Sequence, residues 1–209
     1  MIYAVVNTKG GVSKTTTACH LACMLARNAR TLLIDGDEQK SAASWAMWRR
    51  EAGREPSPTT TCLTGKSIVQ EGRNLATGFD HTVIDVGGRD SAGLRSALLL
   101  AQRAIVPIGA SSLDAAALTD LLTIVDMAKD YNPDLRVDVL LTRLDPRTRD
   151  TAEMANFLSE QQLQVLASRI SERVAFRRAI SEGLIVSEMA SKDPAAIAEM
   201  ENFFAEITK

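Results

Sequence analysis

A ten-residue segment near the N-terminus, NTKGGVSKTT at residues 7–16, combines two glycines, two lysines and several hydroxyl side chains. It follows an apolar run over Ile2–Val6 and precedes a stretch, Thr17–Asn28, that is typical of a helix. A strand, a glycine-containing turn and a helix form a phosphate cradle, because backbone N–H groups of the turn and helix N-terminus point at the anion. In such a cradle Lys14 reaches the β- and γ-phosphates and the Thr15 hydroxyl binds Mg²⁺.

The segment departs from the ordinary P-loop pattern, G-x-x-x-x-G-K-[ST], because Thr8 and Ser13 stand at the two glycine positions. The order Lys9-Gly10-Gly11-x-x-Lys14-Thr15-Thr16 resembles the deviant Walker A motif of the ParA/MinD family of ATPases, which has a signature lysine before two glycines. The nucleotide-binding residues that this resemblance implies are Lys9, Gly10, Gly11, Val12, Ser13, Lys14, Thr15 and Thr16.

Ser13 is the departure that the family pattern does not explain, since the family normally has glycine there. If the φ angle is positive at this residue, serine costs about 1 kcal/mol or more. We therefore expect ATP binding to persist in weakened form, and the sequence leaves open whether hydrolysis is active or impaired.

Lys9 adds a second positive charge to a cradle in which Lys14 already supplies one. In the ParA/MinD family the corresponding lysine crosses to the partner subunit and contacts its phosphates. The resemblance therefore implies a homodimer that ATP and Mg²⁺ hold together. The alternative for Lys9 is a solvent-exposed loop lysine.

Two acidic segments directly follow strand-like runs, where ligands of parallel sheets bind. Asp35 and Asp37 are two residues apart on an extended segment, so they cannot share a face and should have different tasks. One can support the magnesium shell while the other orients or deprotonates the attacking water. The segment resembles the family's D-x-D-P-Q motif, with Glu38 in place of proline, and this resemblance makes Asp37 catalytic beside Lys9 and Lys14. Asp35 would then support the magnesium, and the alternative is a solvated acidic turn.

The second acidic segment is Thr82–Asp85, which fits a Walker B strand whose carboxylate holds Mg²⁺ directly or through water. Thr15, Asp35 and Asp85 are thus the expected metal-site residues. Gly87 and Gly88 follow and would flex as a switch when the γ-phosphate is present.

Strand-like and helix-like runs alternate along the chain, which predicts an α/β fold with a mostly parallel sheet and helices on both faces, as in Rossmann-like P-loop NTPases. We expect one domain over residues 1–209. The expected strands are Ile2–Val6, Thr31–Ile34, Thr82–Ile84, Ala104–Ile108, Val137–Leu141, a weaker Gln164–Ala167 and a short edge strand at Thr60–Cys62. The expected helices are Lys14–Asn28, Ser41–Ala52, Lys66–Leu75, Ala92–Ala101, Leu113–Tyr131, Thr148–Glu160, Glu172–Glu182 and Pro194–Ile207.

Two further segments, GRDSAGLR at residues 88–95 and VPI at 106–108, look like small plasmid-type ParA proteins that segregate DNA. Because the cradle begins at residue 7, the chain resembles the short type without an N-terminal helix-turn-helix. The resemblance implies nonspecific DNA binding, slow hydrolysis stimulated by a ParB-like centromere-binding protein, and a cytoplasmic, nucleoid-associated location. The family usually has asparagine where Thr142 stands, so adenine selectivity carries over only loosely.

The net charge is −2, so any DNA contact needs a local basic patch. The candidate residues are Arg169, Arg173, Arg177 and Arg178. Arg173 and Arg177 lie four apart on an expected helix and would share a face. Clustered arginines neutralise phosphates without sequence preference. The alternative is a solvated face paired with Glu172 and Glu182.

Three other functions share parts of this pattern. A MinD-like membrane role needs a basic amphipathic tail, whereas residues 199–209 are acidic on balance, and no apolar run approaches the roughly 20 residues that span a bilayer; we therefore expect no membrane partner. A metabolic synthetase or reductase needs a substrate pocket or cluster cysteines, which no motif marks. A switch that positions other cargo, such as protein assemblies, stays open because its chemistry would be the same.

Overall fold

The computed structural model describes residues 1–88, 90–144, 154, 156–158, 160, 161 and 163–209. In this part of the chain seven strands form one sheet in the order β3-β2-β4-β1-β5-β6-β7, and every neighbouring pair is parallel. The strands are β1 (Ile2–Val5), β2 (Thr31–Asp35), β3 (Thr59–Cys62), β4 (His81–Asp85), β5 (Arg103–Ile108), β6 (Arg136–Leu144) and β7 (Gln164–Ser171). The expected α/β class is confirmed, and the described sheet is parallel throughout.

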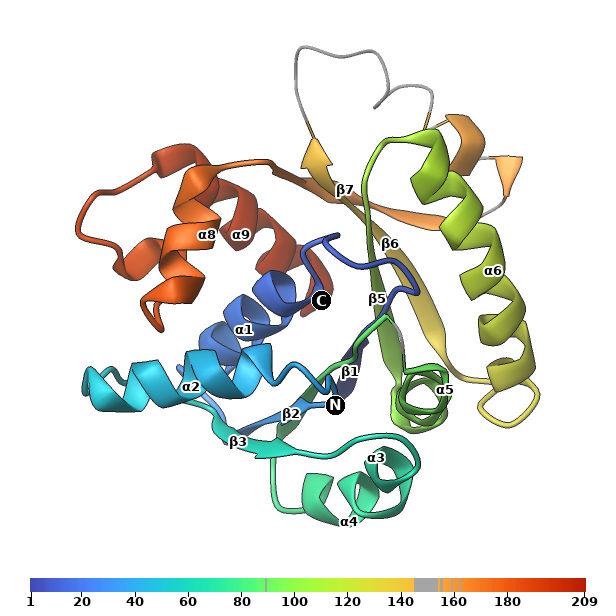
Figure 1. The fold of residues 1–209 in the computed structure, drawn as a ribbon, viewed down its shortest axis with the longest axis horizontal. Helices are drawn as coiled ribbons and strands as arrows, with labels where there is room; N and C mark the ends of the chain where they lie inside the picture. Colours follow the sequence, from blue (N-terminus) through green and yellow to red (C-terminus); the bar gives the residue numbers. More distant parts are fainter. Residues whose placement is uncertain (89, 145–153, 155, 159, 162) are drawn as a thin grey trace.

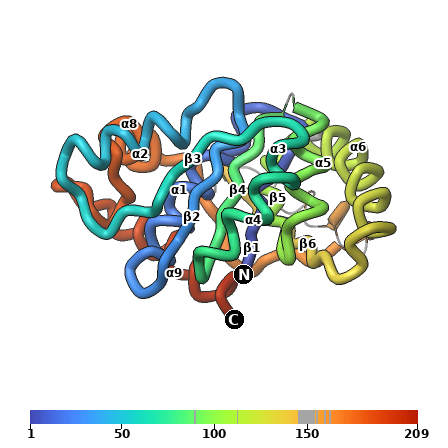
Figure 2. The backbone as a smooth tube through the Cα atoms, turned by 90° about the horizontal axis from the view of Figure 1, so that it is seen from below, coloured from blue at the N-terminus to red at the C-terminus, as the bar shows by residue number. Residues whose placement is uncertain are grey.

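Helices cover both faces of the sheet (Figures 1 and 2). One face carries α1 (Lys14–Leu25), α2 (Ser41–Glu51), α8 (Val174–Ser181) and α9 (Pro194–Ile207), with the short 3₁₀ helix η1 (Val186–Glu188) between the last two. The other carries α3 (Ser67–Gln70), α4 (Gly72–Ala76), α5 (Ser91–Leu100) and α6 (Ser112–Lys129).

The alternating directions of the side chains along β1 explain how one strand contributes to the hydrophobic cores on both faces of the sheet. Tyr3 and Val5 pack beneath α1, whereas Ala4 and Val6 pack beneath α5 and α6, because successive side chains of a strand point to opposite faces. Helix α1 lies between the sheet and α2, α8 and α9, and ten of its twelve residues are buried. A helix that is covered on most sides needs small or apolar residues around most of its circumference, and the sequence KTTTACHLACML supplies them.

Several element boundaries differ from the sequence-based expectations. The helix predicted over Lys66–Leu75 is two short helices, α3 and α4, separated at Glu71. Strand β6 continues to Leu144 and β7 to Ser171, so both run past their predicted ends. Most of the helix predicted over Thr148–Glu160 lies outside the described residues. No helix that the structure describes is long and apolar enough to cross a lipid bilayer.

Candidate nucleotide site

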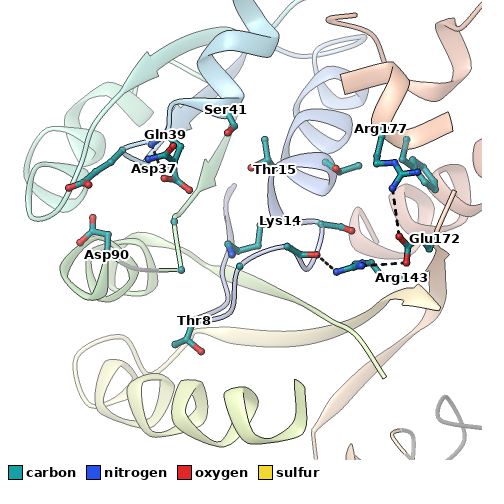
Figure 3. A pocket seen from close by; sticks show the side chains of 18 of the residues that line it. Thr8, Lys14, Thr15, Asp37, Gln39, Ser41, Asp90, Arg143, Glu172 and Arg177 are labelled. Carbon is teal, nitrogen blue, oxygen red and sulfur yellow. Dashed lines mark hydrogen bonds and ion pairs between the residues drawn. The ribbon is translucent and has the colours of Figure 1, made fainter. Parts of the chain in front are cut away.

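The carboxyl ends of the strands surround a cavity of about 1010 Å³ (Figure 3). Its walls come from the loop after β1, from the loops after β2 and β4, and from the segment that joins β7 to α8. Sequence-predicted residues that line it are Gly10, Gly11, Ser13, Lys14, Thr15, Thr16, Asp37, Arg173 and Arg177. The fold therefore gathers most of the predicted phosphate loop and the predicted catalytic carboxylate around one cavity, at the sheet edge where parallel α/β folds bind ligands.

The phosphate loop has the left-handed turns that a cradle needs. Gly11 has a φ of 73°, and Ser13, the residue that precedes the first turn of α1, has a φ of 68°. Lys14 is buried, and its Nζ donates a hydrogen bond to the Lys9 carbonyl at 2.7 Å. Burial lowers the pKa of Lys14, an effect that the nearby carboxylates of Asp85 and Asp37 partly offset. The loop thus places a cation at the start of a helix, where anions bind.

The φ of Ser13 is positive, so the serine adopts a backbone conformation that is strained for a residue with a Cβ. We expect Ser13→Gly to raise the affinity for ATP and the turnover rate severalfold, because glycine takes this conformation without a Cβ clash worth about 1 kcal/mol. Isothermal titration and a phosphate-release assay would measure both quantities. Ser13→Ala is the matched control, since it keeps the Cβ and should show no gain. A Ser13→Gly protein with the affinity and turnover of its parent would show that the loop tolerates serine.

Thr15 and Asp85 form the part of the site that fits Mg²⁺. The Thr15 hydroxyl donates to Asp85 Oδ2 at 2.7 Å. The other carboxylate oxygen of Asp85, Oδ1, is buried and has no hydrogen-bond partner among the described residues. Mg²⁺ prefers oxygen ligands and is commonly held by one or two carboxylates together with substrate phosphates. A hydroxyl beside a carboxylate with an unsatisfied buried oxygen therefore suits this ion.

Burial raises the pKa of Asp85 to about 7, although the Thr15 hydrogen bond opposes the shift. In the unfolded chain this carboxyl titrates near pH 4, so the folded state binds the extra proton between about pH 4 and 7. The resulting stabilisation is complete below about pH 4 and is lost as the pH rises through 7. Urea unfolding without nucleotide or Mg²⁺ should show the parent losing stability relative to Asp85→Asn as the pH rises from 4 to 8. A pH-independent difference between the two proteins would contradict this assignment.

Asp35 lies beside Asp85, since the two residues are paired in the register of β2 and β4. Its side chain is buried, and both oxygens accept backbone hydrogen bonds, Oδ1 from Asp37 N at 3.0 Å and Oδ2 from Ala43 N at 2.7 Å. Burial raises its pKa, and these hydrogen bonds oppose the shift. The carboxylate therefore holds the loop that carries Asp37 against the start of α2. Its support of the magnesium site stays a prediction.

Asp37 lines the cavity, and Oδ1 accepts a hydrogen bond from Gln39 N at 2.9 Å (Figure 3). The loop after β4 approaches it closely, because a Cβ on Gly87 would lie 2.8 Å from the Asp37 carboxylate. A Cβ on Gly88 would lie 2.5 Å from the Thr8 carbonyl. Glycine at these two positions thus lets the loop after β4 pack closely against the Asp37 loop and against the phosphate loop; the flexing of Gly87 and Gly88 as a switch stays a prediction.

Lys9 has a partner that sequence reasoning missed. Its Nζ contacts Asp114 Oδ1 at 2.6 Å, and Asp114 also accepts hydrogen bonds from the N–H and hydroxyl of Ser111. Burial raises the pKa of Asp114, but the bonds from Lys9 and Ser111 outweigh burial and lower it. Ser111 and Asp114 form a capping box at the start of α6. The S-x-x-D pattern could have located this helix start, but not its contact with a lysine 105 positions away.

The four predicted DNA-contacting arginines have different surroundings. Arg173 precedes the first residue of α8, so it does not share a helix face with Arg177 as expected. It is bound by Glu199 at 2.9 Å and lies 3.8 Å from Asp193. Arg177 is exposed and lies 3.9 Å from Glu172, while Arg169 on β7 and Arg178 on α8 are also exposed. DNA binding by these four arginines stays a prediction.

The fold and the site together define a P-loop nucleotide-binding protein. The family model of the CobQ/CobB/MinD/ParA nucleotide binding domain matches residues 3–186, and the chain belongs to this family. The predicted kinship with ParA and MinD is thereby confirmed.

Relatives and solved structures agree with this membership. The chain is 32% identical to a maintenance of carboxysome distribution protein A from Gloeobacter kilaueensis, over 92% of this chain and 86% of the relative. It is 30% identical to the chromosome-partitioning ATPase Soj from Thermus thermophilus, over 93% and 90%. A putative plasmid partition protein from Borrelia burgdorferi bound to AMPPNP has the same fold, with a TM-score of 0.77, 21% identity and coverage of 100% and 98%. The expected cofactors, ATP and Mg²⁺, agree with the family and with the residues present.

Proposed function

We propose that this protein is an ATP-driven switch in which two copies join around ATP and separate after hydrolysis. The observation that carries the proposal is the different placement of the two loop lysines. Lys14 is buried and lines the cavity, whereas the Lys9 amine lies against Asp114 at the start of α6 and the Lys9 side chain is 33% exposed. A partly exposed charge that one carboxylate holds is available to exchange that carboxylate for the phosphates of a second copy.

The residues at the cavity support in-line hydrolysis of the bound nucleotide. Backbone N–H groups of the loop and Lys14 bind the phosphates, and Thr15 and Asp85 would hold the Mg²⁺ that neutralises charge on the transferred group. Asp37 orients the attacking water and accepts its proton. Asp35 keeps the Asp37 loop in place through its bond to Asp37 N.

We further propose that the ATP-bound dimer binds DNA without sequence preference on the nucleoid, through Arg169, Arg177 and Arg178. Arg173 contributes less, because its charge is shared with Glu199 and Asp193. Arginines on each subunit neutralise DNA phosphates, and the dimer doubles their number. A ParB-like protein would then stimulate hydrolysis and release the dimer.

Replacement of Arg177 and Arg178 by alanine should weaken DNA binding at least tenfold and reduce its dependence on salt. Each phosphate contact that is lost lowers the number of counterions that the DNA releases on binding. Fluorescence anisotropy with ATP, over a series of salt concentrations, measures both effects. Arg30→Ala is a matched control, since Arg30 is an exposed arginine at the opposite end of the sheet. Unchanged affinity and salt slope in the double variant would place the DNA surface elsewhere.

Positioning of a protein assembly is the second candidate function. The names of the two relatives favour different cargoes, since one is a carboxysome distribution protein and the other a chromosome-partitioning ATPase. Both functions use the same ATP-dependent dimer. Deletion of the gene separates them: loss of a replicating DNA element supports partition, and clustering of a protein body with stable DNA inheritance supports protein cargo.

A further inference from the structure

The carboxyl end of β6 contacts the phosphate loop through two adjacent side chains. Thr142 Oγ1 donates a hydrogen bond to the Val12 carbonyl at 3.1 Å. The Arg143 guanidinium, which Figure 3 shows, donates to the Gly11 carbonyl at 2.9 Å. Thr142 is fully buried, whereas Arg143 lines the cavity. Two consecutive residues of one strand thus bind two consecutive carbonyls of the loop.

This arrangement determines where the loop N–H groups point. In a trans peptide the C=O and the following N–H lie in one plane and point in opposite directions. A Gly11 carbonyl held toward the Arg143 guanidinium directs the Val12 N–H away from that guanidinium, and a Val12 carbonyl held toward the Thr142 hydroxyl directs the Ser13 N–H away from Thr142. We propose that Thr142 and Arg143 are positioning residues that turn the Val12 and Ser13 N–H groups toward the phosphates. The assignment rests on the proposed nucleotide-binding function.

The backbone of β6 is shaped to make these contacts. Arg143 has a φ of 54°, a left-handed conformation that residues with a Cβ rarely adopt. The pairing of β6 with β7 also shifts register between Thr142 and Leu144. Such irregularities redirect side chains next to functional sites. Here the shift accompanies a change from the buried Thr142 to an Arg143 that faces the cavity.

Arg143 also connects the loop to the outer wall of the cavity. Its guanidinium lies 3.5 Å from Glu172, and Glu172 lies 3.9 Å from Arg177 (Figure 3). The Arg143 and Glu172 side chains are about half exposed, so this ion pair contributes little. The hydrogen bond to Gly11 is therefore the contact through which Arg143 acts on the cradle.

The positioning role can be tested with Mg-ADP, which avoids hydrolysis and ATP-driven dimerisation. Thr142→Val and Arg143→Met each remove one hydrogen bond, and each should weaken Mg-ADP about tenfold in isothermal titration. Thr142→Ser keeps the hydroxyl and should restore affinity to within about twofold of the parent. Thr123→Val and Arg30→Met, at exposed positions on α6 and before β2, are matched controls that should bind like the parent.

A spectroscopic readout separates positioning from a general loss of structure. In the parent, Mg-ADP should shift the amide NMR signals of Val12 and Ser13, and in Thr142→Val and Arg143→Met these two shifts should shrink while other signals keep their native positions. Parent-like affinity and amide shifts in both variants would overturn the assignment and leave nucleotide binding intact. A parent that fails to bind Mg-ADP would instead contradict the proposed function, and the assignment with it.

Discussion

Replacement of Asp37 by alanine should reduce ATP turnover at least about a hundredfold, the lower end of what a positioned general base contributes. Asp37 lines the cavity, and the Asp37 backbone N–H donates a hydrogen bond to Asp35 Oδ1 at 3.0 Å. In the proposed mechanism the phosphates are bound by Lys14 and by N–H groups at the start of α1, and not by Asp37. ATP affinity in Asp37→Ala should therefore stay within a fewfold of the parent.

Single-turnover phosphate release and equilibrium titration with ATP separate these two quantities. Asp134→Ala is the matched control, because Asp134 is an exposed aspartate before β6, at the end of the sheet opposite the cavity. Its turnover should equal that of the parent. An Asp37→Ala protein with parental turnover would assign water activation to another group.

Replacement of Lys9 by alanine should abolish the ATP-dependent dimer while each monomer still binds ATP. In the proposed dimer Lys9 contacts the partner's phosphates, and a charge-assisted contact in a water-excluded site contributes more than an exposed one. The same change removes the Lys9–Asp114 contact at 2.6 Å, so its effect on the monomer must be measured too. Titration of the monomeric Lys9→Ala protein with Mg-ADP measures this effect, and we expect the affinity for Mg-ADP to change little.

Asp114→Asn complements the Lys9 variant. It removes the charge that holds Lys9 at the start of α6, while Asn can still accept the hydrogen bond from Ser111 N. If Lys9 must leave Asp114 to reach a second copy, Asp114→Asn should dimerise at lower ATP concentration than the parent. A dimer that forms normally in Lys9→Ala would show that another group joins the subunits.

Local sequence patterns predicted those parts of the molecule that depend on neighbouring residues. The apolar run after Met1 located β1, and the order of strand, turn and Lys14-Thr15 located the cradle, because strand burial and helix capping leave signals within a few positions. The place of Asp85 at the end of a buried strand was predicted from the same kind of signal, and its role at the metal stays a prediction.

Contacts between distant segments left no such signal. The Lys9–Asp114 pair spans 105 positions, and the Thr142–Val12 hydrogen bond spans 130. Strand β6 was expected to end at Leu141, but it continues to Leu144, and the side chains of Thr142 and Arg143 bind the phosphate loop. Arg173 was expected on a helix face and instead contacts Glu199 on α9, a contact that only the packing of α9 against β7 creates.

The most direct test of the ATP-driven dimer is the mass of the Asp37→Ala protein in solution with Mg-ATP, because this variant keeps the triphosphate intact. Light scattering should give twice the monomer mass with Mg-ATP and the monomer mass with Mg-ADP. Adding Lys9→Ala should return the Mg-ATP sample to the monomer mass. An Asp37→Ala protein that stays monomeric with saturating Mg-ATP, or a Lys9→Ala double variant that still doubles its mass, would contradict the proposed mechanism.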